Sequence, residues 1–531
     1  MLRAILALVV LGAIASCWYW LGRPLPLPPS PLGPSEKLGC VSYTPFHGDQ
    51  TPFTEGQIIP DRQIAEDMER LSRITSCIRT YSAAKAHGRV AAIAGEHGLK
   101  VLQGIWLSRD RSNNRDEIEL ALALARNHPD VIEALIVGNE TLLRGELSVP
   151  QLRKYIGEVR QRSGMPVTYA DVWEFWLKAS QLVDAIDFVT IHILPYWEDD
   201  PVAADDVLAH VRAVRHRITE AFPHKEIFIG EVGWPSAGRM RGQALPSPVN
   251  QARVLTGIVA AAKKEGWRAN LIEAFDQPWK RRLEGTVGGH WGLYDSSTRR
   301  LKFHFGEPLS DHPDWAIKAA LGMGAALLVF LAAWLGERKR ESRWRRTLVV
   351  AGIALAVGLT FGWAALNLTR ENFFLGDQLR AVIMLCLAVV VPMAAGFAVT
   401  RGDQLSSFAN ALTASAWRRG NWVTPVLTLL FVATVVASLQ VALGLVFDPR
   451  YKDFPVASLT APVVALFMLA FTRTHGPLRP GPAEITAALL LLGSSAFIIV
   501  NEGIANWQAV WLAVLLTLMA LTTLRAKAEP G

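Results

Sequence analysis

Cysteine and charge are both scarce in this sequence. Its 531 residues include only four cysteines, too few for a small domain held together by disulfides. Glycine follows no regular period, which excludes a collagen-like chain, and a hydrophobic content of 51% excludes a mainly disordered one. Charged residues number 82 in the first 346 positions but only 19 in the 185 from Thr347 onward. The sequence therefore divides into a largely soluble part and a membrane part.

Eight apolar stretches have the length, roughly 16 to 25 residues, that a helix needs to cross a bilayer. We expect a membrane anchor in residues 1–23, a transmembrane helix in 315–336 and a multispan domain of about six helices in 347–524. A cleaved signal ending near Cys17 is the alternative for the first stretch. A lipid bilayer is thus an expected partner. The eight windows are 2–22, 316–336, 347–368, 381–399, 423–447, 456–471, 485–500 and 509–524.

Basic residues beside these stretches indicate their orientation, because Lys and Arg are retained on the cytoplasmic side. With Met1 inside, fourteen basic residues lie in inside loops and four in the opposite loops. The bias predicts a multi-pass protein of the cytoplasmic (inner) membrane, with residues 24–314 on the periplasmic or extracellular side. We interpret the basic run from Arg338 as a stop-transfer signal and expect no nucleic-acid partner. The inside group is Arg3, Arg338, Lys339, Arg340, Arg343, Arg345, Arg346, Arg401, Arg418, Arg419, Arg473, Arg479, Arg525 and Lys527, and the opposite group is Arg370, Arg380, Arg450 and Lys452.

The region between the first two spans has the length and pattern of one barrel. Six prolines between Pro24 and Pro34 predict a stiff linker over 24–36, and residues 37–310 then have the usual size of a (β/α)₈ domain. Short apolar runs alternate there with helix-like stretches, which predicts a parallel sheet. The expected fold is α/β, a (β/α)8 TIM barrel, joined to an all-α polytopic membrane domain; an open doubly wound sheet is the alternative. The strands are expected at 38–43, 77–81, 101–107, 134–140, 167–172, 188–196, 227–234 and 271–275.

Glutamate stands at the end of two of these expected strands. Glu140 closes the fourth strand, and Glu231 lies near the end of the seventh. The carboxyl ends of barrel strands meet at one face, where chemistry gathers. Two carboxyl groups across that face suit a retaining glycosidase, in which one protonates the leaving oxygen and the other attacks the anomeric carbon. Asn139, next to Glu140, is then expected to bind the sugar 2-hydroxyl. For either glutamate taken alone, a solvent-facing charge is the alternative.

The segment Gly230-Glu231-Val232-Gly233-Trp234-Pro235-Ser236 resembles the active-site signature of family 17 glycoside hydrolases, which are β-1,3-glucanases and related glucosyltransferases. The resemblance covers roughly residues 39–305 and implies Glu140 as acid/base, Glu231 as nucleophile, and a β-glucan polysaccharide or oligosaccharide as the partner. Plant-type members generally carry a further acidic residue in the loop after the eighth strand, where this chain has Gln277-Pro278-Trp279; substitution by Glu273 and the absence of a substitute are the two alternatives. Further motifs that carry the likeness are Ile78–Tyr81, Val137–Glu140 and Phe275–Lys280.

Aromatic and polar residues near the expected strand ends are candidate sugar contacts, because flat sugar faces stack on rings. For each aromatic, a core position is the alternative; for Arg79 a structural ion pair, and for Lys280 a surface charge. The candidate substrate-binding residues are Asn139, Tyr43, Arg79, Tyr81, Tyr196, Trp197, Trp234, Glu273, Trp279 and Lys280.

Histidine and cysteine add little to the site. No pair of the twelve histidines has a metal-site spacing, so we expect no metal and no cofactor. We interpret His192 as a hydrogen-bonded barrel residue. Cys40 and Cys77 begin neighbouring strands, where a disulfide and two free thiols are equal alternatives.

These features predict a membrane-bound retaining enzyme that acts on β-1,3-linked glucan. The fusion to a multispan region resembles bacterial proteins of cyclic β-glucan synthesis, including those that introduce β-1,6 linkages. We therefore favour transfer to a glucan acceptor over hydrolysis by an endo-β-1,3-glucanase, and a membrane glucan synthase is a candidate partner. A non-catalytic glucan-binding or export scaffold is the alternative of another class, although the expected spans carry few of the charges that mark a polar pathway.

Overall fold

The structure, a computed structural model, describes residues 2–337, 344–408, 422–472 and 480–526. Contacts between its elements separate two units. One contains residues 25–238 and 243–309, and the other contains residues 1–24, 239–242 and 310–531.

The first unit is a closed barrel of eight parallel strands in the order β1 to β8, which confirms the predicted fold. The last strand ends earlier than predicted. Beyond it, the backbone amide of Glu273 donates to the Trp291 carbonyl at 3.1 Å and the Leu293 amide donates to the Glu273 carbonyl at 2.8 Å, so this segment pairs with a later loop. The strands are β1 (Leu38–Ser42), β2 (Thr75–Arg79), β3 (Lys100–Ile105), β4 (Ile132–Asn139), β5 (Val167–Val172), β6 (Val189–Ile193), β7 (Ile227–Val232) and β8 (Arg268–Leu271).

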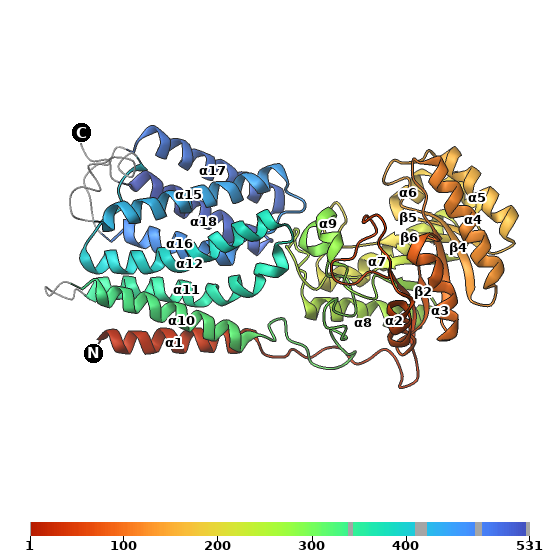
Figure 1. The fold of residues 1–531 in the computed structure, drawn as a ribbon, viewed down its shortest axis with the longest axis horizontal. Helices are drawn as coiled ribbons and strands as arrows, with labels where there is room; N and C mark the ends of the chain where they lie inside the picture. The colour runs from red at the N-terminus through yellow and green to blue at the C-terminus, as the bar shows by residue number, and fades with distance from the viewer. Residues whose placement is uncertain (1, 338–343, 409–421, 473–479, 527–531) are drawn as a thin grey trace. The chain divides into compact units, whose positions relative to one another are not determined.

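Helices follow the strands around the barrel (Figure 1). Ser247 begins one of them, because its hydroxyl accepts from the Asn250 amide at 3.1 Å and Pro248 occupies the first turn. Gly266 ends the same helix at a φ of 68°, a left-handed conformation that glycine adopts without cost. The helices are α2 (Asp61–Ser72), η1 (Lys85–Arg89), α3 (Val90–Glu96), α4 (Arg111–Asn127), α5 (Val149–Ser163), α6 (Trp173–Lys178), η2 (Ser180–Ala185), η3 (Ala204–Asp206), α7 (Val207–Ala221), α8 (Pro248–Glu265), η4 (Pro278–Lys280) and α9 (Arg281–Gly288).

The strands bury both of their faces, in two different clusters. Val41 and Ile78 belong to the large cluster formed with the helices, whereas their neighbours Cys40 and Cys77 belong to a smaller one. This alternation is typical of a barrel wall. Cys40 and Cys77 are register partners on β1 and β2 and form a disulfide, so of the two alternatives for these cysteines the structure has the bond. The smaller cluster also contains Leu102, Ala134, Ile136, Ala170, Phe188 and Phe228.

The second unit is helical. Seven of its described helices have the length and apolar character needed to cross a membrane. The predicted span 456–471 forms the shorter helix α16 (Val456–Ala470), which has 15 residues. The other helices are α1 (Leu2–Leu21), α10 (Trp315–Leu335), α11 (Trp344–Glu371), α12 (Leu375–Arg401), α15 (Val423–Phe447), α17 (Pro482–Glu502) and α18 (Trp507–Arg525). Of the basic residues that predict orientation, Arg338, Lys339, Arg340, Arg343, Arg418, Arg419, Arg473, Arg479 and Lys527 lie outside the described residues.

Small residues let two helices of this unit approach closely. α10 and α11 lie side by side in Figure 1. A Cβ added at Gly322 would stand 1.9 Å from the Gly358 carbonyl oxygen, and one at Gly362 would stand 2.1 Å from that of Lys318. Backbones that pack this closely are typical of helices associated within a bilayer.

Candidate active site

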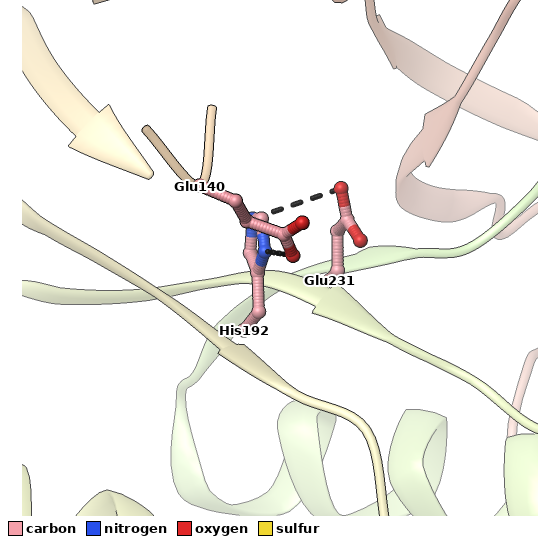
Figure 2. Close-up of side chains that lie close together, drawn as sticks. All are labelled: Glu140, His192 and Glu231. Carbon is pink, nitrogen blue, oxygen red and sulfur yellow. Dashed lines mark hydrogen bonds and ion pairs between the residues drawn. The ribbon is translucent and has the colours of Figure 1, made fainter. Parts of the chain in front are cut away.

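Glu140 and Glu231 meet at the carboxyl end of the barrel, and His192 lies beside them (Figure 2). One carboxylate oxygen of each glutamate and one ring nitrogen of the histidine all lie within 4.8 Å of one another. The Glu231 side chain is 5% exposed and that of Glu140 is 22% exposed. The two glutamates predicted from strand ends are therefore brought together, and they differ in their access to solvent.

The backbone near both glutamates needs glycine at particular positions. Gly138 has a φ of 88° and Glu140 a φ of 51°, so the chain turns through the left-handed region as it leaves β4. Non-glycine residues seldom adopt this conformation, and they cluster at functional sites when they do. Beside the other glutamate, a Cβ added at Gly230 would stand 2.3 Å from Thr190 Cγ2. The residue before Glu231 thus has to be glycine for β6 and β7 to pair as they do.

Arg79 joins Glu231 to Asn139. Its Nη1 donates to Glu231 Oε1 at 2.5 Å and to the Gly230 carbonyl at 3.1 Å, and its Nη2 donates to Asn139 Oδ1. The Tyr81 hydroxyl donates to the same Glu231 oxygen at 2.9 Å. Arg79 is fully buried, so this fork of donors holds the carboxylate and the amide in fixed relative positions.

The charges around Glu231 keep it ionised. Burial alone would raise the pKa of Glu231, but His192, Arg79 and Lys280 together with the hydrogen bond from Tyr81 lower it below its ordinary value. A carboxylate that acts as a nucleophile has to be ionised and held in place, and the groups around Glu231 favour both conditions.

The sequence did not reveal that His192 lies beside both glutamates. It is fully buried on β6, its Nδ1 lies 2.8 Å from Glu140 Oε1, and its Nε2 lies 3.7 Å from Glu231 Oε1. The sequence predicts a hydrogen-bonded histidine in the barrel, and the partner of that hydrogen bond is Glu140. On β7, the register partner of His192 is Glu231. Only the pairing register, which shifts between Ile191 and His192, places the ring beside the two carboxylates.

The loop after Glu140 is held by a second buried pair. The Tyr169 hydroxyl accepts from the Leu142 amide at 2.9 Å and donates to Asp171 Oδ2. Burial, opposed by the hydrogen bond from Tyr169 and assisted by the charge of Glu140, raises the pKa of Asp171 to about 6. These two side chains position the turn from which Glu140 projects.

Glu273 and Lys280 form a buried ion pair, and the charge of Lys280 acts on Glu231. Lys280 Nζ donates to Glu273 Oε2 at 2.8 Å, and burial raises the pKa of Glu273 to about 7. Glu273 Oε1 is buried and has no hydrogen-bond partner among the described residues. In the loop after β8, Gln277 accepts from Trp279 Nε1 at 2.8 Å. The amide therefore positions a candidate sugar-binding ring.

Glu284 is a further acidic group that the sequence did not reveal. It lies on α9, one turn after Lys280. Burial raises the pKa of Glu284, Lys280 lowers it, and the charges of Glu140 and Glu231 raise it. Glu284 thus lies within electrostatic range of both glutamates. The only sequence signal for it is its helical spacing from Lys280.

Three of the candidate sugar-binding aromatics lie in the core of the barrel domain. Tyr43, Tyr196 and Trp234 are fully buried, which favours the core alternative for these three candidate sugar contacts. The Tyr43 hydroxyl donates to Asp67 at 3.0 Å and Trp234 Nε1 donates to the Leu245 carbonyl at 3.1 Å. The candidates that remain half-buried at this end of the barrel are Tyr81, Trp197 and Trp279.

The side chains of Glu140, His192 and Glu231 carry donor atoms of the kind that ligate metal ions. Glu140, His192 and Glu231 each offer one ligand atom within the 4.8 Å separation, and they form the one such group found among the described residues. The guanidinium of Arg79 already occupies Glu231 Oε1, and its positive charge opposes a cation there. The donor set therefore suits acid and nucleophile chemistry better than metal binding.

The barrel part of the chain is similar to known proteins. Residues 40–292 match the family model of the BtgE/BtgC glycoside hydrolase domain. A glucan 1,3-β-glucosidase of Arthroderma benhamiae is 29% identical over 267 residues, which are 47% of this chain and 86% of that protein. A glucan 1,3-β-glucosidase of Saccharomyces cerevisiae is 24% identical over 255 residues, which are 44% of this chain and 81% of that protein.

Among solved structures, an active-site mutant of the β-1,3-glucanosyltransferase of Rhizomucor miehei in complex with laminaritriose is 23% identical. The match covers 51% of this chain and 98% of that chain, with a TM-score of 0.45. The barrel is therefore the glycoside hydrolase domain that the family model describes, and Glu140 and Glu231 lie within the matched residues. Within that class, the chain carries a BtgE/BtgC glycoside hydrolase domain of family 17, which confirms the resemblance seen in its motifs.

Proposed function

We propose that this protein is a membrane-bound enzyme that cleaves β-1,3-glucosidic bonds with retention of configuration and transfers the glycosyl group to a glucan acceptor. The observation that carries the proposal is the approach of Glu140 and Glu231 to within 4.8 Å, with Arg79 and Tyr81 bound to only the second. Carboxyl groups of retaining enzymes lie about 5–5.5 Å apart, whereas inverting enzymes leave room for a water between theirs.

In the first step, Glu140 donates its proton to the glycosidic oxygen while a Glu231 oxygen attacks the anomeric carbon. The bond to the leaving glucan breaks, and an ester forms between the sugar and Glu231. Glu140 is suited to the acid role because it is the more exposed of the two, and among the described residues no Arg or Lys forms an ion pair with it. Glu231 is suited to attack because its surroundings favour the ionised form.

In the second step, Glu140 takes the proton of an incoming hydroxyl, and that oxygen displaces Glu231 from the anomeric carbon. A glucan hydroxyl gives transfer, with a new β-1,3 or β-1,6 linkage, and water gives hydrolysis. Asn139, held by Arg79, is placed to bind the sugar 2-hydroxyl in both steps. The names of the relatives support both outcomes, since they include glucosidases and a glucanosyltransferase.

We infer that the barrel acts outside the cytoplasmic membrane. Seven long apolar helices support a membrane location, and the bias of basic residues supports this orientation. The Cys40–Cys77 disulfide also supports it, because such bonds persist in oxidising compartments. A membrane glucan synthase that supplies nascent chains is the partner this location suggests.

The test uses the full chain in detergent micelles with a linear β-1,3-gluco-oligosaccharide. Products are analysed by mass and by linkage, and the anomeric configuration is followed by NMR. We expect longer or branched products of β configuration, and we expect the Glu231→Gln variant to bind the oligosaccharide without turning it over. Only shorter products would assign hydrolysis, α products would exclude retention, and unchanged substrate with a folded wild-type chain would exclude the enzyme in favour of a glucan-binding scaffold.

A further inference from the structure

The turn that leaves β4 holds Glu140 in an unusual backbone conformation. Glu140 has a φ of 51°, in the left-handed region that residues other than glycine seldom adopt. Such a conformation persists only where the surrounding contacts fix it. The backbone rotations of Glu140 also set the direction in which its side chain leaves the chain. The contacts of the peptide groups on either side of Glu140 therefore determine where its carboxyl group lies.

Arg144 binds the peptide groups on both sides of Glu140. Its Nη1 donates to the Asn139 carbonyl, and its backbone amide donates to the Glu140 carbonyl at 2.9 Å. The amide of Glu140 donates to the Ala170 carbonyl of β5 at 2.8 Å. The first peptide group precedes the rotation φ of Glu140 and the second follows its rotation ψ. These three hydrogen bonds, two of them from Arg144, therefore fix both rotations.

The side chain of Arg144 is itself anchored to the residues that follow β3. Its Nη2 donates to the Leu107 carbonyl at 3.0 Å and to Glu146 Oε2 at 3.0 Å. Its Cζ lies 4.3 Å from the centroid of the Trp106 ring. A guanidinium is a rigid, planar fork of donors, so the contacts of Nη2 and of the ring also fix the position of Nη1. Arg144 thus ties the turn after β4 to the end of β3.

The other glutamate of the site is held by different side chains. The hydrogen bonds described for the Glu231 carboxylate come from Arg79, on β2, and from Tyr81, two residues further along the chain. Replacement of Arg144 leaves these donors in place. Its effect is therefore expected to fall on Glu140 and to spare Glu231.

We propose that Arg144 is a positioning residue, which fixes the backbone of Glu140 and so directs its carboxyl group at the glycosidic oxygen. The proposal rests on the proposed function, since it takes Glu140 to be the acid/base. Without the guanidinium, the peptide group between Asn139 and Glu140 is free to rotate out of the left-handed conformation, and the carboxyl group moves with it. Displacement of a catalytic group by about 1 Å lowers a rate by up to about 100-fold.

The experiment compares kcat/KM of the full chain in detergent micelles for two substrates. One is a linear β-1,3-gluco-oligosaccharide, whose leaving oxygen needs a proton from the acid. The other is the dinitrophenyl glycoside of the β-1,3-linked disaccharide, whose leaving group departs without one. We expect Arg144→Met to lose about 10- to 100-fold on the oligosaccharide and less than about threefold on the dinitrophenyl glycoside. In a Glu140→Ala background, where the acid is already absent, the same substitution should change oligosaccharide cleavage by less than about twofold.

Two variants serve as controls for a general loosening of the turn. Arg109 Nη2 donates to the Gly145 carbonyl at 3.1 Å, in the same turn but away from the peptide groups that flank Glu140. Arg109→Met should therefore stay near the wild type on both substrates. Arg144→Lys keeps the charge without the fork of donors, and its loss on the oligosaccharide should be smaller than that of Arg144→Met.

The outcomes distinguish this proposal from the proposed function. If the wild-type chain cleaves neither substrate, or if Glu140→Ala loses equally on both, the proposed function fails and this proposal fails with it. If the wild type and Glu140→Ala behave as expected, equal losses of Arg144→Met on both substrates, or an equal loss with and without Glu140, overturn the positioning role alone. Should Arg144→Met not fold, as judged by its thermal unfolding, Arg144→Lys decides: a loss confined to the oligosaccharide supports the proposal, and any other result overturns it.

Discussion

Arg79 is the residue whose replacement tests the site most directly. The variant Arg79→Met keeps much of the side-chain volume but removes the guanidinium donors to Glu231, Asn139 and the Gly230 carbonyl. Glu231 then remains a buried carboxylate whose nearest described donors are the Tyr81 hydroxyl at 2.9 Å and His192 Nε2 at 3.7 Å. We expect both the stability of the barrel and its activity to fall.

The size of the expected stability loss follows from the burial of the Arg79–Glu231 ion pair. Removal of one partner of a buried ion pair costs about 3–5 kcal/mol, and the remaining hydrogen bond from Tyr81 places this case at the lower end, about 3 kcal/mol. If the same loss appears in the transition state, kcat/KM falls about 100-fold. Arg62→Met is the matched control, because the Arg62 side chain is 89% exposed and its ion pair with Glu66 is worth less than about 1 kcal/mol.

The effect of Arg79→Met on stability and activity is expected to depend on pH, with a sign that follows from the pKa of Glu231. In the wild type the folded-state pKa of Glu231 is lowered, so its contribution to stability is present at neutral pH and is lost as the pH falls through that pKa. Loss of Arg79 raises the pKa of Glu231. The variant should therefore be most destabilised, relative to the wild type, at neutral pH and less so in acid, and the acid limb of its activity profile should move to higher pH.

The assay combines urea unfolding, followed by tryptophan fluorescence at pH 7 and pH 5, with kcat/KM measured across the same range. Arg79→Lys retains the charge without the fork of donors and should fall between the wild type and Arg79→Met. If Arg79→Met matched Arg62→Met in stability and in its acid limb, the reasoning that Arg79 keeps Glu231 ionised would be refuted.

Three further predictions concern the same barrel. Glu140→Ala should lose about 10²- to 10⁴-fold in rate on gluco-oligosaccharides but much less in the glycosylation step of an aryl glucoside with a good leaving group, measured as a burst of phenol; equal losses on both would refute the acid role. Joint replacement of Cys40 and Cys77 by serine should lower the unfolding free energy by about 2–4 kcal/mol, and a reductant should then have no further effect on the thermal midpoint, whereas an unchanged midpoint in the variant would count against a stabilising bond. Glu284→Gln removes a negative charge near Glu231 and should move the acid limb of kcat/KM to lower pH, so a shift to higher pH would contradict its placement.

The local features of the barrel could be predicted from the sequence because they depend on neighbouring residues. Alternation of apolar runs with helical stretches predicts a parallel barrel, since each βαβ unit closes with the same hand. The position of Glu231 could be predicted in the same way, because this glutamate stands near the end of an apolar strand. The apolar spans were visible as composition alone.

Several features of the site depend on register, which no local pattern contains. His192 lies beside the two glutamates only because β6 shifts against β7 next to it. Whether an aromatic ring is a sugar surface or core depends on packing against other elements, as with Tyr43, whose hydroxyl donates to Asp67 of α2.

The sequence alone determined that this protein has a barrel with two glutamates at strand ends and a set of apolar helices, because spacing and composition are properties of the chain itself. The tertiary structure decided which groups surround those glutamates. Arg79 is 152 residues from Glu231 in the chain, and Glu284 is brought within electrostatic range of both glutamates by the loop after β8. The pKa of a carboxyl group depends on charges within a few ångströms, and only the closed barrel determines which charges those are.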